Sequence, residues 1–109
     1  MNASKAFDLG VNYLEKDELA MALVAFNEAI RLDPSVAQAY NGRGVVHALR
    51  DELDNALADC CEALRLDPWN PEFYRTRGYV YSRLGQEEQS RADLAKAEEF
   101  ETALEKQAP

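Results

Sequence analysis

The sequence of 109 residues has few of the residues that catalytic and metal-binding sites most often use, with one His and two Cys. The cysteines, Cys60 and Cys61, are neighbours, so they cannot form the disulfide framework of a small secreted domain. No Cys and His residues cluster at the spacing of metal ligands, and no set of base, nucleophile and anion-stabilising donors is recognisable. We therefore expect a protein that is not an enzyme and that has no metal and no cofactor.

Positive charge and long apolar runs are also scarce. The 12 Lys and Arg residues stand against 20 Asp and Glu residues, which gives a net charge of −8. Such a surface repels phosphate and anionic lipid, so nucleic-acid and membrane partners are disfavoured. No apolar run approaches the roughly 20 residues that span a bilayer. The first residues lack the apolar core of a secretory signal. These features predict a cytoplasmic protein.

Glycine and proline are few, but their positions recur at a fixed interval. The segment EAIRLDP, which ends at Pro34, returns 34 positions later as EALRLDP, which ends at Pro68. Gly10, Gly44 and Gly78 follow the same interval. Self-similarity of this kind indicates a repeat protein. The sequence predicts one domain over residues 1–109, made of three units at 3–36, 37–70 and 71–104 and a tail at 105–109.

Each unit has the hydrophobic periodicity of two helices. In the first unit, Leu9 and Tyr13 fall on one helical face, and Leu19, Leu23 and Phe26 form a second stripe. Short polar breaks separate the two helices, and connections of this length make neighbouring helices antiparallel. No strand pattern is present in the sequence. The fold class predicted is therefore all-α, with six helices.

The joints between units carry signals for the ends and starts of helices. Pro34 and Pro68 end the second helices, because the residue before a proline disfavours the helical region. Ser35 and Gln38 have capping-box spacing and predict the start of a helix. Asn70 stands before a proline, which predicts an N-cap followed by proline at the first helical position.

The repeated pattern resembles the tetratricopeptide repeat, whose signature runs aromatic, Leu, Gly and Tyr on one helix, then Ala, Phe and Ala on the next, then Pro. The first unit supplies Leu9, Gly10, Tyr13, Ala22, Phe26, Ala29 and Pro34. The second departs at Arg43, His47 and Cys60, and the third at Arg77, Ser90 and Leu94. The resemblance implies an α-solenoid of three helix-turn-helix hairpins in a right-handed superhelix, with first helices lining the concave side. Small residues permit the close approach within each hairpin, so we expect Gly10, Gly44 and Gly78 to face Ala22, Ala56 and Ser90.

The resemblance also implies a function, because the concave groove of this family binds peptide segments of partner proteins. The matching first-helix positions are Phe7, Val11, Asn41, Val45, Arg75, Tyr79 and Ser82. They are apolar in the first unit and cationic and aromatic in the third, which would suit a peptide with an apolar anchor and an acidic group. The alternative for these side chains is packing between adjacent first helices.

One subclass of the family holds the carboxylates of chaperone C-terminal tails with Lys, Asn and Arg. The matching positions here are Phe7, Val11, Gly42, Glu72 and Thr76, and none of them fits. We therefore expect no binding of chaperone tails by such a clamp. A self-assembling scaffold is the alternative function, with Phe7 or the outer faces of the terminal helices as the contact between copies. Polar Arg91 and Glu98 on the last helix are what a terminal cap of the array needs.

Four arginines gather around the first helix of the third unit: Arg43, Arg75, Arg77 and Arg83. They form either an anion subsite, which would also be the basis of RNA binding, or internal pairs with Asp residues. Arg43 and Arg77 occupy the core Leu place of the family, which favours pairing for these two. For Arg75 the two readings stay open.

Three further residues invite a chemical role. Cys60 occupies a core aromatic place, which favours a buried small hydrophobe over redox chemistry. His47 occupies a core Tyr place, and His47 with Cys60 as a nucleophile pair lacks a recognisable third, orienting group. Trp69 lies at the joint between units two and three, where we expect its ring to cover the seam, with an exposed contact as the alternative.

Overall fold

The computed structural model describes residues 1–108 as six helices joined by short turns. They are α1 (Ala3–Glu15), α2 (Leu19–Leu32), α3 (Ala37–Leu49), α4 (Leu53–Leu66), α5 (Pro71–Arg83) and α6 (Glu87–Gln107). No strand occurs within residues 1–108, so the all-α prediction is confirmed. None of these six helices is both long and apolar enough to cross a membrane.

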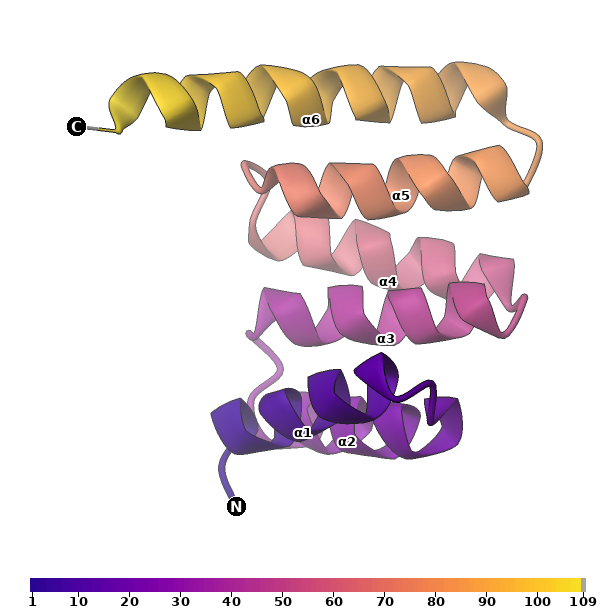
Figure 1. Cartoon of the computed structure of the whole chain (residues 1–109), viewed down its shortest axis with the longest axis vertical. Coiled ribbons are helices and arrows are strands. Elements are labelled where there is room, and N and C mark those ends of the chain that lie inside the picture. The colour runs from indigo at the N-terminus through magenta and orange to yellow at the C-terminus, as the bar shows by residue number, and fades with distance from the viewer. Residues whose placement is uncertain (109) are drawn as a thin grey trace.

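Each helix packs against its neighbours in the sequence, which gives the molecule a linear core. The pairs α1–α2, α3–α4 and α5–α6 form hairpins, and contacts of α2 with α3 and of α4 with α5 join one hairpin to the next. The first helices also touch one another, α1 with α3 and α3 with α5. Figure 1 shows the resulting stack, with α1 and α2 at one end and α6 at the other. The expected solenoid of stacked hairpins is confirmed, and stacking buries the apolar face that a lone hairpin would expose.

Within each hairpin the chain reverses through a residue in the left-handed region. Asp17, Asp51 and Gly85 have φ angles of 59°, 63° and 78°, and they occupy the same place in the three repeats. The next amide bonds back five residues, as Glu18 does to the Tyr13 carbonyl oxygen at 2.9 Å. This closure is the Schellman ending of a helix. Glycine adopts the conformation without steric cost, and aspartate is one of the few other residues that tolerate it.

The two predicted helix starts have different outcomes. Asn70 caps α5, because its side-chain oxygen accepts a hydrogen bond from the Glu72 amide at 3.0 Å, which confirms that prediction. The capping box at Ser35 is wrong, since α3 begins only at Ala37. Both the amide and the hydroxyl of Ser35 donate to the Asp33 carboxylate, at 3.0 and 2.6 Å. This local turn occupies the serine, so it has no part in capping the helix.

Phe26 is completely buried, and two glycines make room for its ring. A methyl group on Gly10 of α1 or on Gly42 of α3 would lie 2.6 Å from the nearest ring carbon. Both distances are far inside normal carbon–carbon contact, so only glycine fits at either place. We expected Gly10 to face Ala22, but its nearest neighbour is the Phe26 ring. The space for Phe26 is completed by the second hairpin.

The later hairpins keep the expected close approach of two helices. A methyl group on Gly44 would lie 3.3 Å from the carbonyl oxygen of Ala56, and one on Gly78 would lie 3.3 Å from that of Ser90. In the place of Phe26, these hairpins have Cys60 and Leu94. Cys60 is fully buried, whereas Leu94 is 46% exposed because no further hairpin covers α6.

Near the far end of the stack, Trp69 does not lie where we expected it. The indole is 69% exposed, and only its edge meets the ring of Phe100, at a centroid distance of 5.4 Å. The ring of Phe100 also contacts that of Tyr74, at a centroid distance of 5.5 Å. The seam prediction is therefore wrong, and the exposed alternative holds. Figure 1 shows the last turns of α6 running on past the start of α5.

Candidate functional site

Two hollows lie side by side across the first helices of the three hairpins. The α3–α5 hollow lies between α3 and α5, and the α1–α3 hollow lies mainly between α1 and α3. Each encloses about 260 Å³, and Val45 of α3 lines both. The two hollows adjoin at Val45, and together we call them the first-helix groove.

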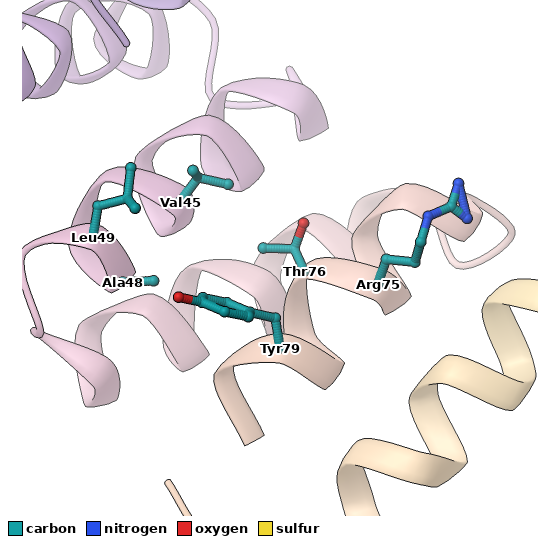
Figure 2. A pocket seen from close by; sticks show the side chains of 6 residues that line it. All are labelled: Val45, Ala48, Leu49, Arg75, Thr76 and Tyr79. Atoms are coloured by element: carbon teal, nitrogen blue, oxygen red, sulfur yellow. The ribbon is translucent and has the colours of Figure 1, made fainter. Parts of the chain in front are cut away.

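The α3–α5 hollow is mostly apolar. It is lined by Val45, Ala48, Leu49, Arg75, Thr76 and Tyr79. Figure 2 shows the Tyr79 ring reaching from α5 towards Ala48 of α3, while the guanidinium of Arg75 points away from the hollow. Leu49 and Tyr79 are each about half exposed. Half-exposed apolar and aromatic side chains around a concave surface are typical of the anchor pockets of peptide grooves.

The α1–α3 hollow has an apolar wall and a polar, acidic rim. Its apolar lining comes from Phe7, Val11, Leu14, Phe26, Val45 and Phe73. Its polar lining comes from Glu15, Gln38, Asn41 and Glu72. Phe7 packs on the buried Phe26 at a centroid distance of 5.8 Å, so this wall is continuous with the hydrophobic core.

The structure brings together six of the seven residues predicted from the sequence. Phe7, Val11, Asn41 and Val45 line the α1–α3 hollow, and Val45, Arg75 and Tyr79 line the α3–α5 hollow. Ser82 lines neither, and its hydroxyl lies 3.4 Å from Glu87 at the turn into α6. Sequence reasoning missed Leu49, Glu15 and Gln38. Leu49 could have been found, because it lies one helical turn after Val45 on the same face.

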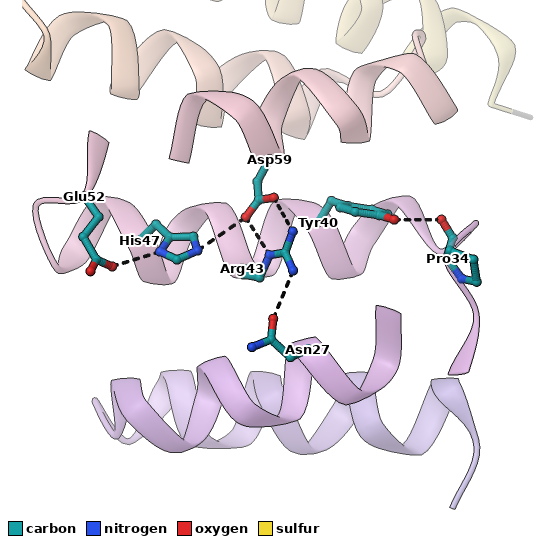
Figure 3. Close-up of polar contacts among 7 residues, drawn as sticks. All are labelled: Asn27, Pro34, Tyr40, Arg43, His47, Glu52 and Asp59. Atoms are coloured by element: carbon teal, nitrogen blue, oxygen red, sulfur yellow. Dashed lines mark hydrogen bonds and ion pairs between the residues drawn. The ribbon is translucent and has the colours of Figure 1, made fainter. Parts of the chain in front are cut away.

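Arg43 and Arg77 are held in internal ion pairs, as the sequence favoured. Arg43 donates two hydrogen bonds to Asp59, at 2.7 and 2.8 Å, and Arg77 does the same to Asp93, at 2.8 and 2.9 Å. The aspartates are almost completely buried. Bidentate pairing raises the pKa of both guanidinium groups, so these arginines stay charged at every accessible pH. Figure 3 shows the Arg43 pair together with its third bond, to Asn27 of the preceding hairpin.

The remaining arginines of the cluster are also paired. Arg75 contacts Glu101 of α6 at 3.0 Å, and Arg83 contacts Asp51 at 2.8 Å. Both pairs are exposed to solvent, where such pairs are weak, so the anion subsite at Arg75 stays a prediction. The partner peptide with an acidic group, expected from the sequence, stays a prediction as well.

His47 and Cys60 are arranged for structure and not for nucleophilic chemistry. The Nδ1 atom of His47 lies 2.9 Å from Glu52, and this hydrogen bond lowers the pKa of Glu52. Its other ring nitrogen lies 3.8 Å from the Asp59 carboxylate. Glu52 is the orienting group that the sequence did not reveal. Burial raises the pKa of the Cys60 thiol to about 12, so the thiolate nucleophile is not populated near neutral pH.

No group of three or more His, Cys, Asp and Glu side chains that could hold a metal occurs in the part of the chain that the structure describes. Cys60 is buried, Cys61 is exposed, and neither forms a disulfide.

Comparison with known proteins identifies the repeat. The family model described as Tetratricopeptide repeat matches residues 6–36 and 71–105, which together make up more than half of the chain. The chain belongs to the tetratricopeptide repeat family. The two matches cover the first and third hairpins, and the middle hairpin, which carries Arg43, His47 and Cys60, lies outside them. No curated protein matches the sequence at a significant level.

Solved structures of other tetratricopeptide repeat proteins share the fold. The crystal structure of MamA is 27% identical with a TM-score of 0.87, and the match covers 96% of this chain and 61% of MamA. This chain thus spans less than two thirds of the MamA chain. The first tetratricopeptide repeat domain of Spaghetti (RPAP3), bound to the HSP90 peptide SRMEEVD, is 20% identical with a TM-score of 0.89, over 93% of this chain and 80% of that one. The second domain of the same protein, bound to the same peptide, is 19% identical with a TM-score of 0.87, over 92% and 93%.

Proposed function

We propose that the protein is a non-catalytic interaction module that binds a peptide segment of a partner protein in the first-helix groove. The observation that carries this proposal is the pair of adjacent hollows, which six of the predicted first-helix residues, from all three hairpins, help to line. Phe7, Val11, Asn41 and Val45 form one half of the site, and Arg75 and Tyr79 complete the other. The two unpaired cysteines are typical of reducing compartments, and we place the protein's action in the cytoplasm for this reason.

Selection of binding peptides from a random displayed library tests the proposal. The selected peptides are synthesised and titrated against wild type and the variant that combines Arg75→Ala with Tyr79→Ala. We expect the double variant to keep its thermal midpoint within a few degrees and to lose at least tenfold in affinity, since an aromatic anchor is removed. Glu99→Ala, on the outer surface of α6, serves as the matched control and should bind as wild type does. Equal affinity of all three proteins would place the site elsewhere.

We further propose that the groove does not hold acidic chaperone tails. At the positions that would have to supply cations, the chain has Thr76 in one hollow and Glu72 at the rim of the other. A carboxylate at the rim repels the carboxylates of such a tail. Titration with the peptide SRMEEVD tests this point, and salt-sensitive binding in the micromolar range would contradict it.

Self-assembly is the second candidate, and the open face of the first hairpin favours it. An apolar hollow of about 160 Å³ lies there, bordered by Leu9, Tyr13, Met21 and Val24, and Val24 is 61% exposed. The outer face of α6 is polar, so two copies would meet through their first hairpins. Light scattering over a range of concentrations tests this association. A dimer that Val24→Lys abolishes would support it, and a monomer at high concentration would exclude it.

A further inference from the structure

The α1–α3 hollow contains a polar atom that has no partner in the protein. Asn41 of α3 is 6% exposed and lines this hollow. Within residues 1–108 its Oδ1 atom is the single buried side-chain oxygen or nitrogen without a hydrogen bond. A buried amide oxygen that lacks a donor is costly to keep and is rare in folded proteins. Asn41 therefore places at the wall of the hollow an acceptor that no group in the described residues satisfies.

The charges around Asn41 indicate what kind of donor fits. Glu15 of α1 and Glu72 of α5 line the same hollow. Within the described residues neither carboxylate pairs with a cation, and no Lys or Arg lines this hollow. Arg75 lines the neighbouring α3–α5 hollow, where it is paired with Glu101 of α6. The field inside the α1–α3 hollow is thus negative, in a protein whose net charge is −8.

The walls complete the description of the ligand. Phe7, Val11 and Phe73 supply apolar surface beside the amide oxygen and the two carboxylates. A long aliphatic stem that ends in positively charged donors fits such a lining, and only Lys and Arg side chains have this form. The volume of about 260 Å³ is below the usual range for drug-sized ligands and suits a single long side chain.

We propose that the α1–α3 hollow takes a lysine or arginine side chain, so that the partner of the groove is a basic peptide segment. The apolar α3–α5 hollow takes a neighbouring apolar side chain of the same segment. This proposal rests on the proposed function, and it replaces the acidic partner that the arginine cluster had suggested. The negative charge of the whole protein attracts such a segment and speeds its association at low salt.

Three pools of blocked hexapeptides test the proposal with the full chain. The pools share a random mixture of Ala, Leu, Val and Ser, and differ in one fixed residue, which is Arg, Gln or Glu. Amide shifts of Val11, Asn41 and Val45 in NMR spectra report binding in the groove, whatever the peptide. We expect the Arg pool to bind at least tenfold more tightly than the Glu pool. Groove binding with equal or better affinity for the Gln or Glu pool would overturn the basic partner and leave the peptide groove standing. No groove shifts with any pool would overturn both.

A variant at Asn41 separates a role in recognition from a role in structure. Asn41→Ala removes an oxygen that bonds to nothing in the free protein, so its thermal midpoint should stay the same or rise. Affinity for the Arg pool should fall about tenfold, as expected for a lost hydrogen bond to a charged group. A lower midpoint with unchanged affinity would show a merely structural role and overturn the proposal.

Glu72, one of the two carboxylates at the rim, is tested with a control variant that removes the same charge elsewhere. Glu72→Gln should weaken binding of the Arg pool about threefold and reduce its salt dependence. Glu88→Gln removes the same charge at the start of α6, outside both hollows, and should leave the affinity within twofold of wild type. Equal effects of the two substitutions would show that only the net charge matters, which would contradict a site at the rim.

Discussion

Where the first hairpin has Leu9 and Ala25, the second has Arg43 and Asp59, and the third repeats the arginine–aspartate pair at the same places. The first hairpin fills its interior with the ring of Phe26, whereas the later hairpins use smaller groups and bury the ion pair beside them. The same backbone geometry is therefore stabilised in one case by apolar burial and in the other by a paired charge. The difference shows that the repeat requires a fixed spacing and small residues at a few positions. The other interior positions can be either apolar or charged, as long as a charged side chain is paired.

The largest effect should come from removing the ring that the first hairpin depends on. Phe26→Ala removes a fully buried ring, and we expect a loss of about 3–5 kcal/mol in the free energy of unfolding. Leu94→Ala, at the same place in the third hairpin, should cost less than about 1 kcal/mol because the side chain is 46% exposed. Urea denaturation of both variants measures the contrast, and losses of equal size would contradict it.

The second effect concerns the buried ion pair. Arg43→Leu leaves the Asp59 carboxylate, whose side chain is only 8% exposed, without its cation. We expect a loss of about 3 kcal/mol in the free energy of unfolding. Combining Arg43→Leu with Asp59→Ala installs the residues of the first hairpin, and should return stability to within about 1 kcal/mol of wild type. A complete double-mutant cycle by urea denaturation measures the coupling, and additive losses would show that the two chemistries are not interchangeable.

The third effect appears in the pH dependence of stability. The Cys60 thiol ionises at 9.0 when it is unperturbed, and burial raises its pKa to about 12. Stability from the buried neutral thiol is thus fully present below pH 9 and is lost as the pH rises from 9 towards 12. At pH 10 we expect a loss of about 1 kcal/mol relative to pH 7.

Urea denaturation in the presence of reductant measures this dependence. Other groups also titrate above pH 9, so the control is Cys60→Ala, which should decline less steeply over the same range. Identical slopes for the two proteins would show that the thiol is not the cause.

The smallest effect is expected at the surface, where the first two hairpins are alike. Arg31 pairs with Glu28, and Arg65 pairs with Glu62, at the same interval of three residues. Both pairs are exposed to solvent, and pairs of this kind contribute little to stability. Arg31→Ala and Arg65→Ala should each leave the urea midpoint unchanged within the scatter of the measurement. A distinct shift in one of them alone would mean that the hairpins also differ on their outer surface.

Most of the fold could be predicted because it depends on spacing. The 34-residue interval and the small residues place the helices, and these features are visible in the sequence alone. The first-helix positions of the groove follow from the same spacing, which is why six of the seven predicted residues line the two hollows. Ser82 fails because α5 ends one residue later and the chain turns away from the groove.

The sequence did not reveal individual side-chain contacts, because each side chain has several neighbours with which it could pair. Ser35 bonds with Asp33, and Trp69 stays exposed beside Phe100, where we had expected it to cover the seam. The unpartnered oxygen of Asn41 depends on the absence of any donor within reach. The positions of all neighbouring side chains decide such contacts, and a periodic pattern does not contain them.

The enclosure of Phe26 has a consequence for how the protein is made. Its ring needs Gly42 of α3 as well as Gly10 of α1, so the first hairpin cannot close its interior by itself. During synthesis the two helices of that hairpin leave the ribosome before α3 does, and the ring stays accessible until α3 has followed. The shortest nascent chain with a sealed interior therefore contains the first three helices. From that point each new hairpin needs only the one before it, which favours rapid, ordered folding from the N-terminus.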